Sequence, residues 1–302
     1  MGIIRKWQRF LNAYVGQEYD GIRHYNWIGG DHSWFAQFVH SRFDGRDLSK
    51  LSFVSVFGSP RTFWFHRDEK KVFWTGENLN RYRKYHKKLP VALSLGFDEK
   101  EETDYLRFPI WLLYLFEPTD TPEEIRRKIC AIAERRPQKT EFAALVARHD
   151  PGHLRQEMVE QLSKIAPVAS AGAFMHNDDR LWKTDQNNKI QYLSRFRFSI
   201  CPENSDAPGY VTEKLFEAFL AGAVPIYWGA GGAPEAGRLN PRTYLLWNKN
   251  GDNTGLLEQI AVLNADSKAY EQFLNESPFL PAFSDYVIER FEKLEQKLAK
   301  LL

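Results

Sequence analysis

The chain has 302 residues, of which 43% are hydrophobic, so it is long enough for two domains with cores of ordinary size. Its 41 basic and 39 acidic residues nearly balance, which argues against a dedicated nucleic-acid-binding protein, because such proteins carry a strongly basic field. The two cysteines, Cys130 and Cys201, exclude a disulfide framework and a thiolate metal site, and they fit a reducing compartment.

The N-terminal residues 3–14 have the spacing of an amphipathic helix, with the basic residues Arg5, Lys6 and Arg9 off its apolar face. Two interpretations stay open: the helix docks on the first domain, or it lies on a membrane surface. No apolar run approaches the ~20 residues of a spanning helix, and no signal-peptide core is present. We therefore expect a cytoplasmic protein, with a place peripheral to the inner membrane as the second interpretation.

The remainder of the first half alternates predicted helices and strands, which is typical of an α/β domain. A proline-rich segment at 117–137, with a helix at 122–134, is interpreted as the connection between two domains, 1–137 and 138–302. The other predicted elements of the first domain are a helix at 33–43 and strands at 51–57, 71–74, 91–95 and 110–116.

The second domain is predicted to open with a strand and to end with helices. The last helix carries an apolar stripe, and we expect it to cross back and pack on the first domain. The predicted elements are a strand at 142–147, a helix at 153–165, a strand or loop at 168–173, and helices at 267–274 and 284–302.

Residues 195–229 form the most informative part of the chain, a predicted strand–helix–strand unit. A strand at 195–201 leads through turn residues to a helix at 211–220 and an apolar strand at 223–228. Such a unit aims the unpaired N–H groups of the helix N-terminus at the carboxyl edge of the sheet. Tyr210, Glu213 and Lys214 are expected near this first turn, so the residues alone predict a diphosphate-sugar site.

One long run, PENSDAPGYVTEKLFEAFLAGAVPIYWG at 202–229, resembles the donor-binding motif of the α-1,3/1,4-fucosyltransferase family. Three shorter segments match that family in the right order: KVFWTGEN at 71–78, YLRFPIW at 105–111, and 145–162, which contains Arg155. The resemblance covers most of residues 70–230, whereas the first 60 residues match poorly. Animal and plant relatives usually carry an N-terminal Golgi anchor, so either a bacterial-type enzyme or a chain that has lost its anchor would look like this one.

The resemblance implies an α/β fold of the GT-B type, with two facing Rossmann-like domains and an active-site cleft between them. It implies inverting transfer of L-fucose from GDP-β-L-fucose to a hydroxyl of a GlcNAc-containing acceptor, giving an α-1,3-linked fucoside. Two alternatives stay open: a transferase of another nucleotide sugar on the same scaffold, and a non-catalytic sugar-binding protein. The presence of Glu77, Glu213 and Lys214 argues against the second.

Glu77 is the candidate catalytic base, because it follows the predicted strand 71–74 and a Thr-Gly turn. This places it at the carboxyl end of a strand, where α/β proteins hold their ligands. An ionised carboxylate there can accept the proton of the attacking acceptor hydroxyl. Without the motif, a glutamate in a turn is more often an ordinary surface residue, and the resemblance to the TGEN segment reverses that expectation.

The donor is expected to be held by charged residues of the second domain. Lys214 and Arg155 are the candidates for neutralising the diphosphate, although either one alone is more often a solvated surface charge. Glu213, which we group with Glu77 and Lys214 as catalytic, is expected to face the positive charge that develops on the fucose ring. Donor-binding roles are also expected for Asn204 and Tyr210 at the nucleotide pocket and for Glu203 at the ribose.

No metal and no cofactor are expected, GDP-fucose being a substrate. Asp178 and Asp179 are adjacent acids, but no third ligand is spaced with them, and the resemblance implies a fold that needs no metal for catalysis. The segment 81–88, RYRKYHKK, departs from the better-known bacterial relatives and is interpreted as a solvated loop beside the acceptor cleft rather than a nucleic-acid groove.

Overall fold

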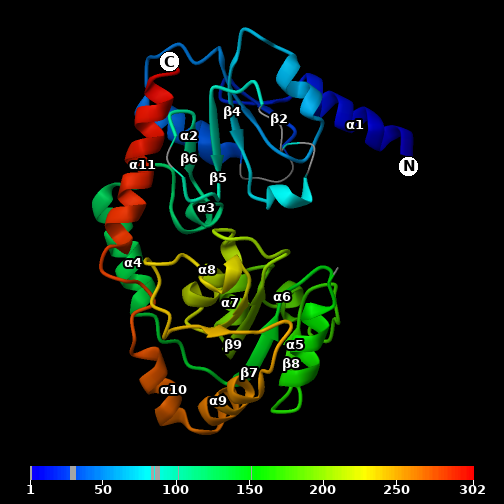
Figure 1. Ribbon diagram of the computed structural model, residues 1–302, viewed down its shortest axis with the longest axis vertical. Helices are drawn as coiled ribbons and strands as arrows, with labels where there is room; N and C mark the ends of the chain where they lie inside the picture. The colour runs from blue at the N-terminus through cyan, green and yellow to red at the C-terminus, as the bar shows by residue number, and fades with distance from the viewer. Residues whose placement is uncertain (1, 28–31, 83–84, 86–88, 101, 151) are drawn as a thin grey trace. The chain divides into compact units, whose positions relative to one another are not determined.

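The computed structural model describes residues 2–27, 32–82, 85, 89–100, 102–150 and 152–302, which form two compact units (Figure 1). Unit 1 comprises Met1–Ile125 and Ser284–Leu302, and unit 2 comprises Arg126–Phe283. Unit 2 thus begins before residue 138, where the sequence placed the boundary. The reason lies in helix α4 (Pro122–Ala133), whose Ile132 lines a pocket together with Phe219 of unit 2.

Unit 1 is built on a six-stranded sheet whose strands follow one another in chain order. The first pair is antiparallel and the other pairs are parallel, so the carboxyl ends of β2 to β6 share one edge. The strands are β1 (Gln17–Tyr19), β2 (Ile22–Tyr25), β3 (Leu51–Val54), β4 (Lys70–Trp74), β5 (Leu93–Gly96) and β6 (Tyr105–Arg107).

Aromatic side chains form much of the core of unit 1. Phe291 of the last helix has ring contacts with Trp34 and Phe38 of α2 and with Phe108, so residues of 284–302 are part of this core. The helices of unit 1 are α1 (Gly2–Tyr14), α2 (His32–Arg42), α3 (Trp111–Leu115) and α11 (Phe283–Ala299), with short 3₁₀ turns at η1 (Pro60–Trp64) and η2 (Leu79–Arg81).

The prediction of a strand at 110–116 is wrong, because residues 111–115 of this segment form helix α3. The strand lies earlier, at β6, and its ladder ends where Phe108 donates to the carbonyl of Gly96. Beyond Pro109 the chain turns, and Leu112 and Leu115 are buried at helical spacing. A short continuous apolar run does not distinguish a strand from a buried helix, which explains the error.

Unit 2 contains a five-stranded, wholly parallel sheet in the order β11-β10-β9-β7-β8. The chain runs outward from β7 to β8 and then returns to β9 on the other side of β7, which makes β7/β9 the switch point of the sheet. Ligands of such sheets bind outside the carboxyl ends of the strands at this point. The strands are β7 (Glu141–Leu145), β8 (Val168–Ser170), β9 (Phe196–Pro202), β10 (Val224–Trp228) and β11 (Leu245–Leu246).

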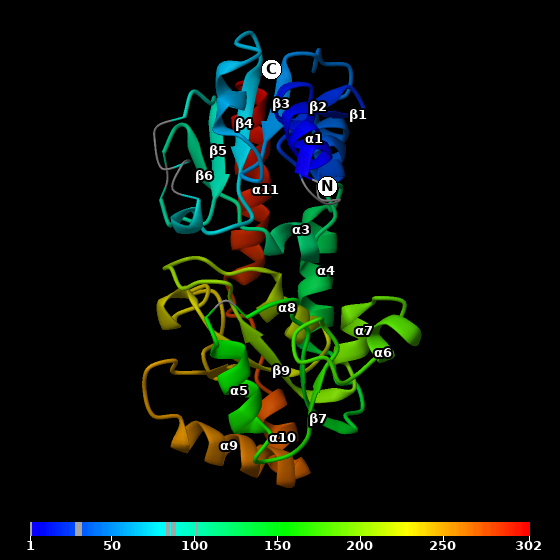
Figure 2. The same ribbon diagram turned by 90° about the vertical axis from the view of Figure 1, so that its right-hand side faces the viewer.

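Helices cover both faces of this sheet, as Figure 2 shows for α5 on one side and α6 and α7 on the other. Alternation along β7 produces the two cores, since Ala143 and Leu145 join one hydrophobic cluster and Ala144 the other. One cluster includes residues of α5 (Leu154–Leu162), α9 (Thr254–Ala265) and α10 (Ser267–Leu274), and the other includes residues of α6 (Arg180–Lys183) and α7 (Lys189–Leu193).

The predicted strand–helix–strand unit at 195–229 is confirmed as β9, α8 (Glu213–Leu220) and β10. β9 and β10 pair in parallel, and α8 packs on both strands. The N-terminus of α8 therefore lies at the carboxyl edge of the sheet, as the sequence predicts.

Candidate active site

A buried carboxylate organises the start of α8. Glu203, the first residue after β9, accepts hydrogen bonds from the Thr212 N–H and the Thr212 hydroxyl, both at 2.7 Å. Thr212 is the residue that precedes the helix, and its own side chain caps no N–H group. The carboxylate of Glu203 thus fixes the turn from which α8 begins, a task that a side-chain cap performs in most helices.

The last residue of the PIYWG motif makes room for Glu203. Gly229 has φ 138°, and a Cβ atom built on it would lie 2.8 Å from Cγ of Glu203. Glu203 is 2% exposed, and burial raises the pKa of its carboxyl group although Lys214 opposes this rise. Both of its carboxylate oxygens are engaged within the protein, so the described contacts assign Glu203 a structural task, and its ribose contact stays a prediction.

Lys214 lies at the centre of the charged cluster. Its ammonium nitrogen is 3.3 Å from a carboxylate oxygen of Glu203, 3.3 Å from one of Glu213, and 2.8 Å from the Thr212 hydroxyl oxygen. Burial alone would lower the pKa of Lys214, but the two carboxylates outweigh burial and raise it above its ordinary value. Lys214 is therefore a cation at neutral pH, held at the N-terminus of α8.

Glu213, the first residue of α8, extends the cluster along the helix. Burial opposes its ionisation, yet attraction to Lys214 and Lys189 holds the pKa of Glu213 below its ordinary value. One turn further on, Glu217 pairs with Lys189 at 3.1 Å. The side chain of Glu213 keeps 16% exposure, so this carboxylate is ionised and partly open to solvent.

Arg155 of α5 bridges two loops at the switch point. Its guanidinium donates to the His149 carbonyl, which follows β7, at 3.0 Å and to the Pro202 carbonyl, at the end of β9, at 3.3 Å. It also donates to the side-chain oxygen of Asn204 at 3.0 Å. Arg155 is only 5% exposed, so it is a built-in part of the carboxyl edge and not the solvated surface charge that its residue type favours.

Tyr210 lies in the turn before α8, where its N–H donates to the Ala207 carbonyl at 3.1 Å. Its side chain is 1% exposed, so it packs inside unit 2 in this structure. Lining of the nucleotide pocket by Tyr210 therefore stays a prediction.

Glu77 belongs to unit 1 and follows β4, as the sequence predicts. The Thr75 side-chain oxygen accepts from the Glu77 N–H at 3.0 Å and donates to the Glu77 carbonyl at 2.6 Å, which fixes the backbone of the turn. A Cβ on Gly76 would lie 2.7 Å from Cδ1 of Ile110, so a larger residue at position 76 would require the Ile110 side chain to move. The Glu77 carboxylate is 3.5 Å from Nη1 of Arg81 and its side chain keeps 20% exposure.

The structure thus brings five predicted donor residues together in unit 2: Arg155, Glu203, Asn204, Glu213 and Lys214. Three further residues contact this cluster and are not predicted from the sequence: Thr212, Lys189 and Tyr227. The Tyr227 hydroxyl lies 3.4 Å from Oε1 of Glu203. Thr212 belongs to the GYVTEK run and Tyr227 to the PIYWG run, so the motifs themselves could have pointed to both residues. Lys189 lies 28 positions before its partner Glu217, and no pattern in the sequence points to it.

The acidic pair Asp178 and Asp179 is engaged in ion pairs. The Arg180 guanidinium holds the pKa of Asp178 down at about 2, and the Asp179 carboxylate binds Lys183 and His176. Within the described residues, no group of three or more His, Cys, Asp or Glu side chains could hold a metal ion. Residues 83, 84 and 86–88 of the basic-aromatic segment 81–88 lie outside the described residues.

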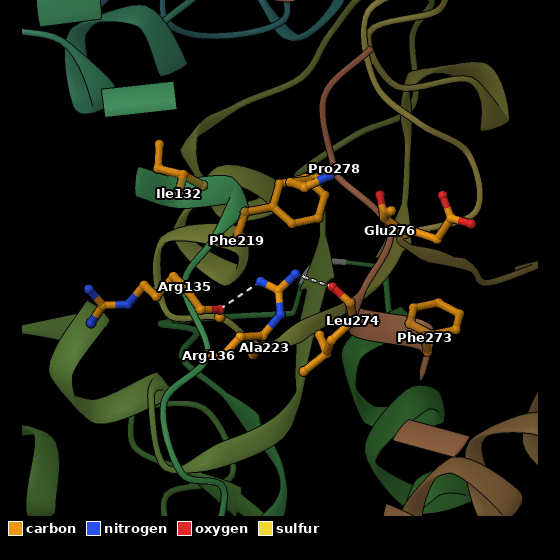
Figure 3. A pocket seen from close by; sticks show the side chains of 11 residues that line it. Ile132, Arg135, Arg136, Phe219, Ala223, Phe273, Leu274, Glu276 and Pro278 are labelled. Atoms are coloured by element: carbon orange, nitrogen blue, oxygen red, sulfur yellow. Dashed lines mark hydrogen bonds between the residues drawn. The ribbon is translucent and has the colours of Figure 1, made fainter. Parts of the chain in front are cut away.

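A small pocket of unit 2 lies at the opposite edge of the sheet (Figure 3). It is lined at Gly222 and Ala223, just before the amino end of β10, and by Arg136, whose guanidinium donates to the Leu274 carbonyl. The charged cluster of Lys214 lies at the carboxyl edge, so this pocket is separate from the candidate site.

Two family models match the chain over most of its length. Residues 135–278 match the model described as glycosyltransferase family 10 (fucosyltransferase) C-term, and residues 29–114 match the alpha-(1,3)-fucosyltransferase FucT N-terminal domain. The first match contains the whole charged cluster of unit 2, and the second contains Glu77.

Similar proteins fall in the same group. Alpha-(1,3)-fucosyltransferase FucT of Helicobacter pylori is 28% identical over 262 residues, which is 77% of this chain and 52% of that protein. Alpha-(1,3)-fucosyltransferase B of Drosophila melanogaster is 34% identical over 84 residues, 25% of this chain and 19% of that protein. The chain thus spans about half the length of the first relative and less of the second.

A solved structure has the same fold. The crystal structure of an α1,3-fucosyltransferase with GDP-fucose matches with a TM-score of 0.62 and 22% identity, over 95% of this chain and 96% of that chain. Together with the mostly parallel sheet of unit 1 and the parallel sheet of unit 2, this confirms the expected α/β fold class of the GT-B type. No helix in the described part of the chain is long and apolar enough to cross a membrane.

Proposed function

The chain belongs to glycosyltransferase family 10, the fucosyltransferases, and on this premise we propose that it transfers L-fucose from GDP-β-L-fucose to a hydroxyl of a GlcNAc-containing acceptor. The product would be an α-1,3-linked fucoside. The observation that carries the proposal is the cluster of Lys214, Glu203 and Glu213 at the N-terminus of α8. A cation fixed by buried carboxylates beside the unpaired N–H groups of a helix suits a bound diphosphate.

In the proposed reaction, the acceptor oxygen attacks C1 of fucose and the bond from C1 to the diphosphate oxygen breaks. Glu77 accepts the hydroxyl proton, and Lys214 balances the charge that develops on the departing GDP. Glu213 faces the positive charge on the ring. The acceptor oxygen attacks the face of the fucose ring opposite the diphosphate, in a single displacement. The β-linked donor therefore gives an α-linked product.

The experiment is a donor and acceptor screen. GDP-fucose, GDP-mannose, UDP-galactose and UDP-GlcNAc are each offered with GlcNAc-containing oligosaccharides, lipopolysaccharide-like glycans or an N-glycan core, and products are separated by chromatography. Transfer from GDP-fucose alone is expected. Transfer from another donor would favour a transferase of a different sugar, and binding without transfer would favour a sugar-binding protein.

We expect catalysis to need no metal. Lys214, Arg155 and the N–H groups of α8 supply positive charge where a divalent cation would otherwise act on the diphosphate. The initial rate in excess EDTA, after metal-free purification, is expected to stay within about twofold of the untreated rate. Near-complete loss that manganese restores would contradict this expectation.

We further propose that the protein works in the reducing cytoplasm with α1 on the membrane surface. Trp7, Phe10, Leu11 and Tyr14 of this helix are 42–62% exposed, which is unusual for a row of large apolar side chains. The sequence of α1 contains three basic and no acidic residues, which suits an anionic lipid surface.

Vesicle sedimentation tests this placement of α1. The wild-type protein is expected to sediment with phosphatidylglycerol vesicles, and the double change Trp7→Ser with Phe10→Ser should reduce binding by roughly tenfold or more, because two aromatic side chains no longer enter the interface. Gln8→Ser is the matched control, since it changes an exposed polar neighbour. Equal sedimentation of all three proteins would contradict the proposal.

A further inference from the structure

Lys249 is a cation of unit 2 that the sequence motifs do not include. It follows β11 closely, and its ammonium nitrogen lies 5.2 Å from the ring centroid of Trp228, the last residue of β10. The side chain is half-buried. A lysine over an aromatic face is attracted by the ring, and such an arrangement keeps the ammonium group in one place without neutralising its charge.

This lysine lies at the same edge of the sheet as the candidate donor site. The Trp247 N–H donates to the Tyr227 carbonyl at 2.8 Å, which ties the chain before Lys249 to the carboxyl end of β10. On the other side, a Cβ atom built on Gly152 would lie 3.4 Å from Nζ of Lys249. Gly152 precedes Arg155 by three residues, so Lys249 faces the loop that leads into α5.

Trp228 connects Lys249 to the charged cluster at α8. The backbone carbonyl of Trp228 accepts from the Glu203 N–H at 2.9 Å, and the carboxylate of Glu203 binds Lys214. Lys249 and Lys214 are therefore attached to neighbouring strand ends of the same sheet edge.

Three cations at this sheet edge, Lys214, Arg155 and Lys249, differ in how far neighbouring groups of the protein already balance their charge. The positive charge of Lys214 is partly balanced, because its ammonium group contacts the carboxylates of Glu203 and Glu213. The guanidinium of Arg155 donates to two backbone carbonyls and an amide oxygen, and its Nη1 lies 4.0 Å from a carboxylate oxygen of Asp150. Lys249, by contrast, has no ion pair with any carboxylate among the residues that the structure describes. An incoming anion would gain most from the cation whose charge is least balanced.

We infer that Lys249 is a further diphosphate-binding residue of the donor site, which leaves the face of Trp228 when the phosphate oxygens of the donor arrive. This inference rests on the proposed function, because it requires a nucleoside diphosphate at the carboxyl edge of unit 2. Lysine binds phosphate as a point charge with three donors, so the contact depends on the diphosphate and is indifferent to the base.

Calorimetry with GDP and with guanosine tests the inference. Lys249→Met keeps an unbranched side chain only one atom shorter and removes its charge. It is expected to weaken GDP binding roughly tenfold or more and to leave guanosine binding unchanged. The slope of log Kd for GDP against log salt should also fall, because one charge no longer meets the phosphates. Lys164→Met is the matched control, since Lys164 is an exposed lysine of the same unit that contacts Gln161. Thermal unfolding of both variants is compared with the wild-type protein.

The outcomes separate the inference from the proposed function. If the wild-type protein fails to bind GDP, the proposed function falls and the inference falls with it. If the wild-type protein binds GDP and Lys249→Met binds it as well as Lys164→Met does, the inference alone is overturned. An equal loss of GDP and guanosine affinity in Lys249→Met would also overturn it, because the contact would then be with the nucleoside.

Discussion

Replacing Glu77 with glutamine is expected to abolish fucosyl transfer while the affinity for GDP-fucose stays near the wild-type value. Glutamine keeps the size of the side chain but cannot take the proton of the acceptor hydroxyl, a loss that should reduce the rate by on the order of a hundredfold or more. The fold of the turn should survive, because Thr75 bonds the backbone of Glu77 and not its carboxylate. Chromatography of the product and calorimetry with GDP-fucose measure the two effects separately.

Arg81→Gln is the control for this substitution. It removes the 3.5 Å ion pair with Glu77 and leaves the carboxylate in place. Exposed pairs of this kind contribute little to stability, so the Arg81 variant should fold normally. Transfer by Glu77→Gln within threefold of the wild-type rate would remove Glu77 from the mechanism, and a similar loss in both variants would show that the ion pair matters and the base does not.

Replacing Lys214 with alanine should weaken GDP and GDP-fucose alike, by roughly tenfold to a hundredfold, because both ligands carry the diphosphate. It should also destabilise the fold, since Glu203 would keep a buried carboxylate without its cation. Breaking a buried pair costs about 3–5 kcal/mol, and we expect about 3 kcal/mol because the Lys214 side chain is 23% exposed.

The loss of stability should depend on pH. Burial already raises the pKa of the Glu203 carboxyl group above its ordinary value, and removal of Lys214 raises it further. The folded variant then holds this proton more tightly than the unfolded chain, so its stability should fall as pH rises from about 4.5 toward neutrality. Urea unfolding across this pH range measures the effect. A Lys214 variant as stable at pH 7 as at pH 5 would contradict the assignment.

A double substitution separates binding from folding at this site. Glu203→Gln combined with Lys214→Ala removes the orphaned charge, so stability should recover while GDP binding stays weak. Glu213→Ala is expected to behave in the opposite way, with normal GDP binding and collapsed transfer, because its proposed partner is the sugar. Normal GDP binding in Lys214→Ala together with lost binding in Glu213→Ala would show that the two roles have been exchanged.

The sequence predicts the part of the site that is local in the chain. β9, α8 and β10 have regular apolar spacing, and the helix N-terminus between two parallel strands follows from their order, so the positions of Glu213 and Lys214 were predictable. The strand wrongly predicted at 110–116 had no such periodicity. Its run of apolar residues suits a strand or a buried helix equally, and the packing of unit 1 decides between them.

What the sequence does not reveal is how the charges of the site are balanced. Glu203 looks like a turn residue with a free carboxylate, yet burial and the Thr212 hydrogen bonds make it the structural partner of Lys214. Lys189 pairs with Glu217 of α8, and Lys249 lies over Trp228 at the end of β10, although both lysines are distant from these partners in the sequence. The tertiary fold, with the strand order β11-β10-β9-β7-β8, brings these segments near one another. Residue type and local spacing carry no information on such contacts.

The most direct test of the central claim is proton NMR of one reaction, with GDP-β-L-fucose and a GlcNAc-containing oligosaccharide as the substrates of the wild-type protein. The account predicts that the β-anomeric signal of the donor disappears while the signal of an α-linked fucoside grows in equal amount with free GDP. A β-linked fucoside would contradict the inverting displacement. A donor that stays unchanged with every acceptor offered, or free fucose as the sole product, would contradict the assignment of fucosyl transfer.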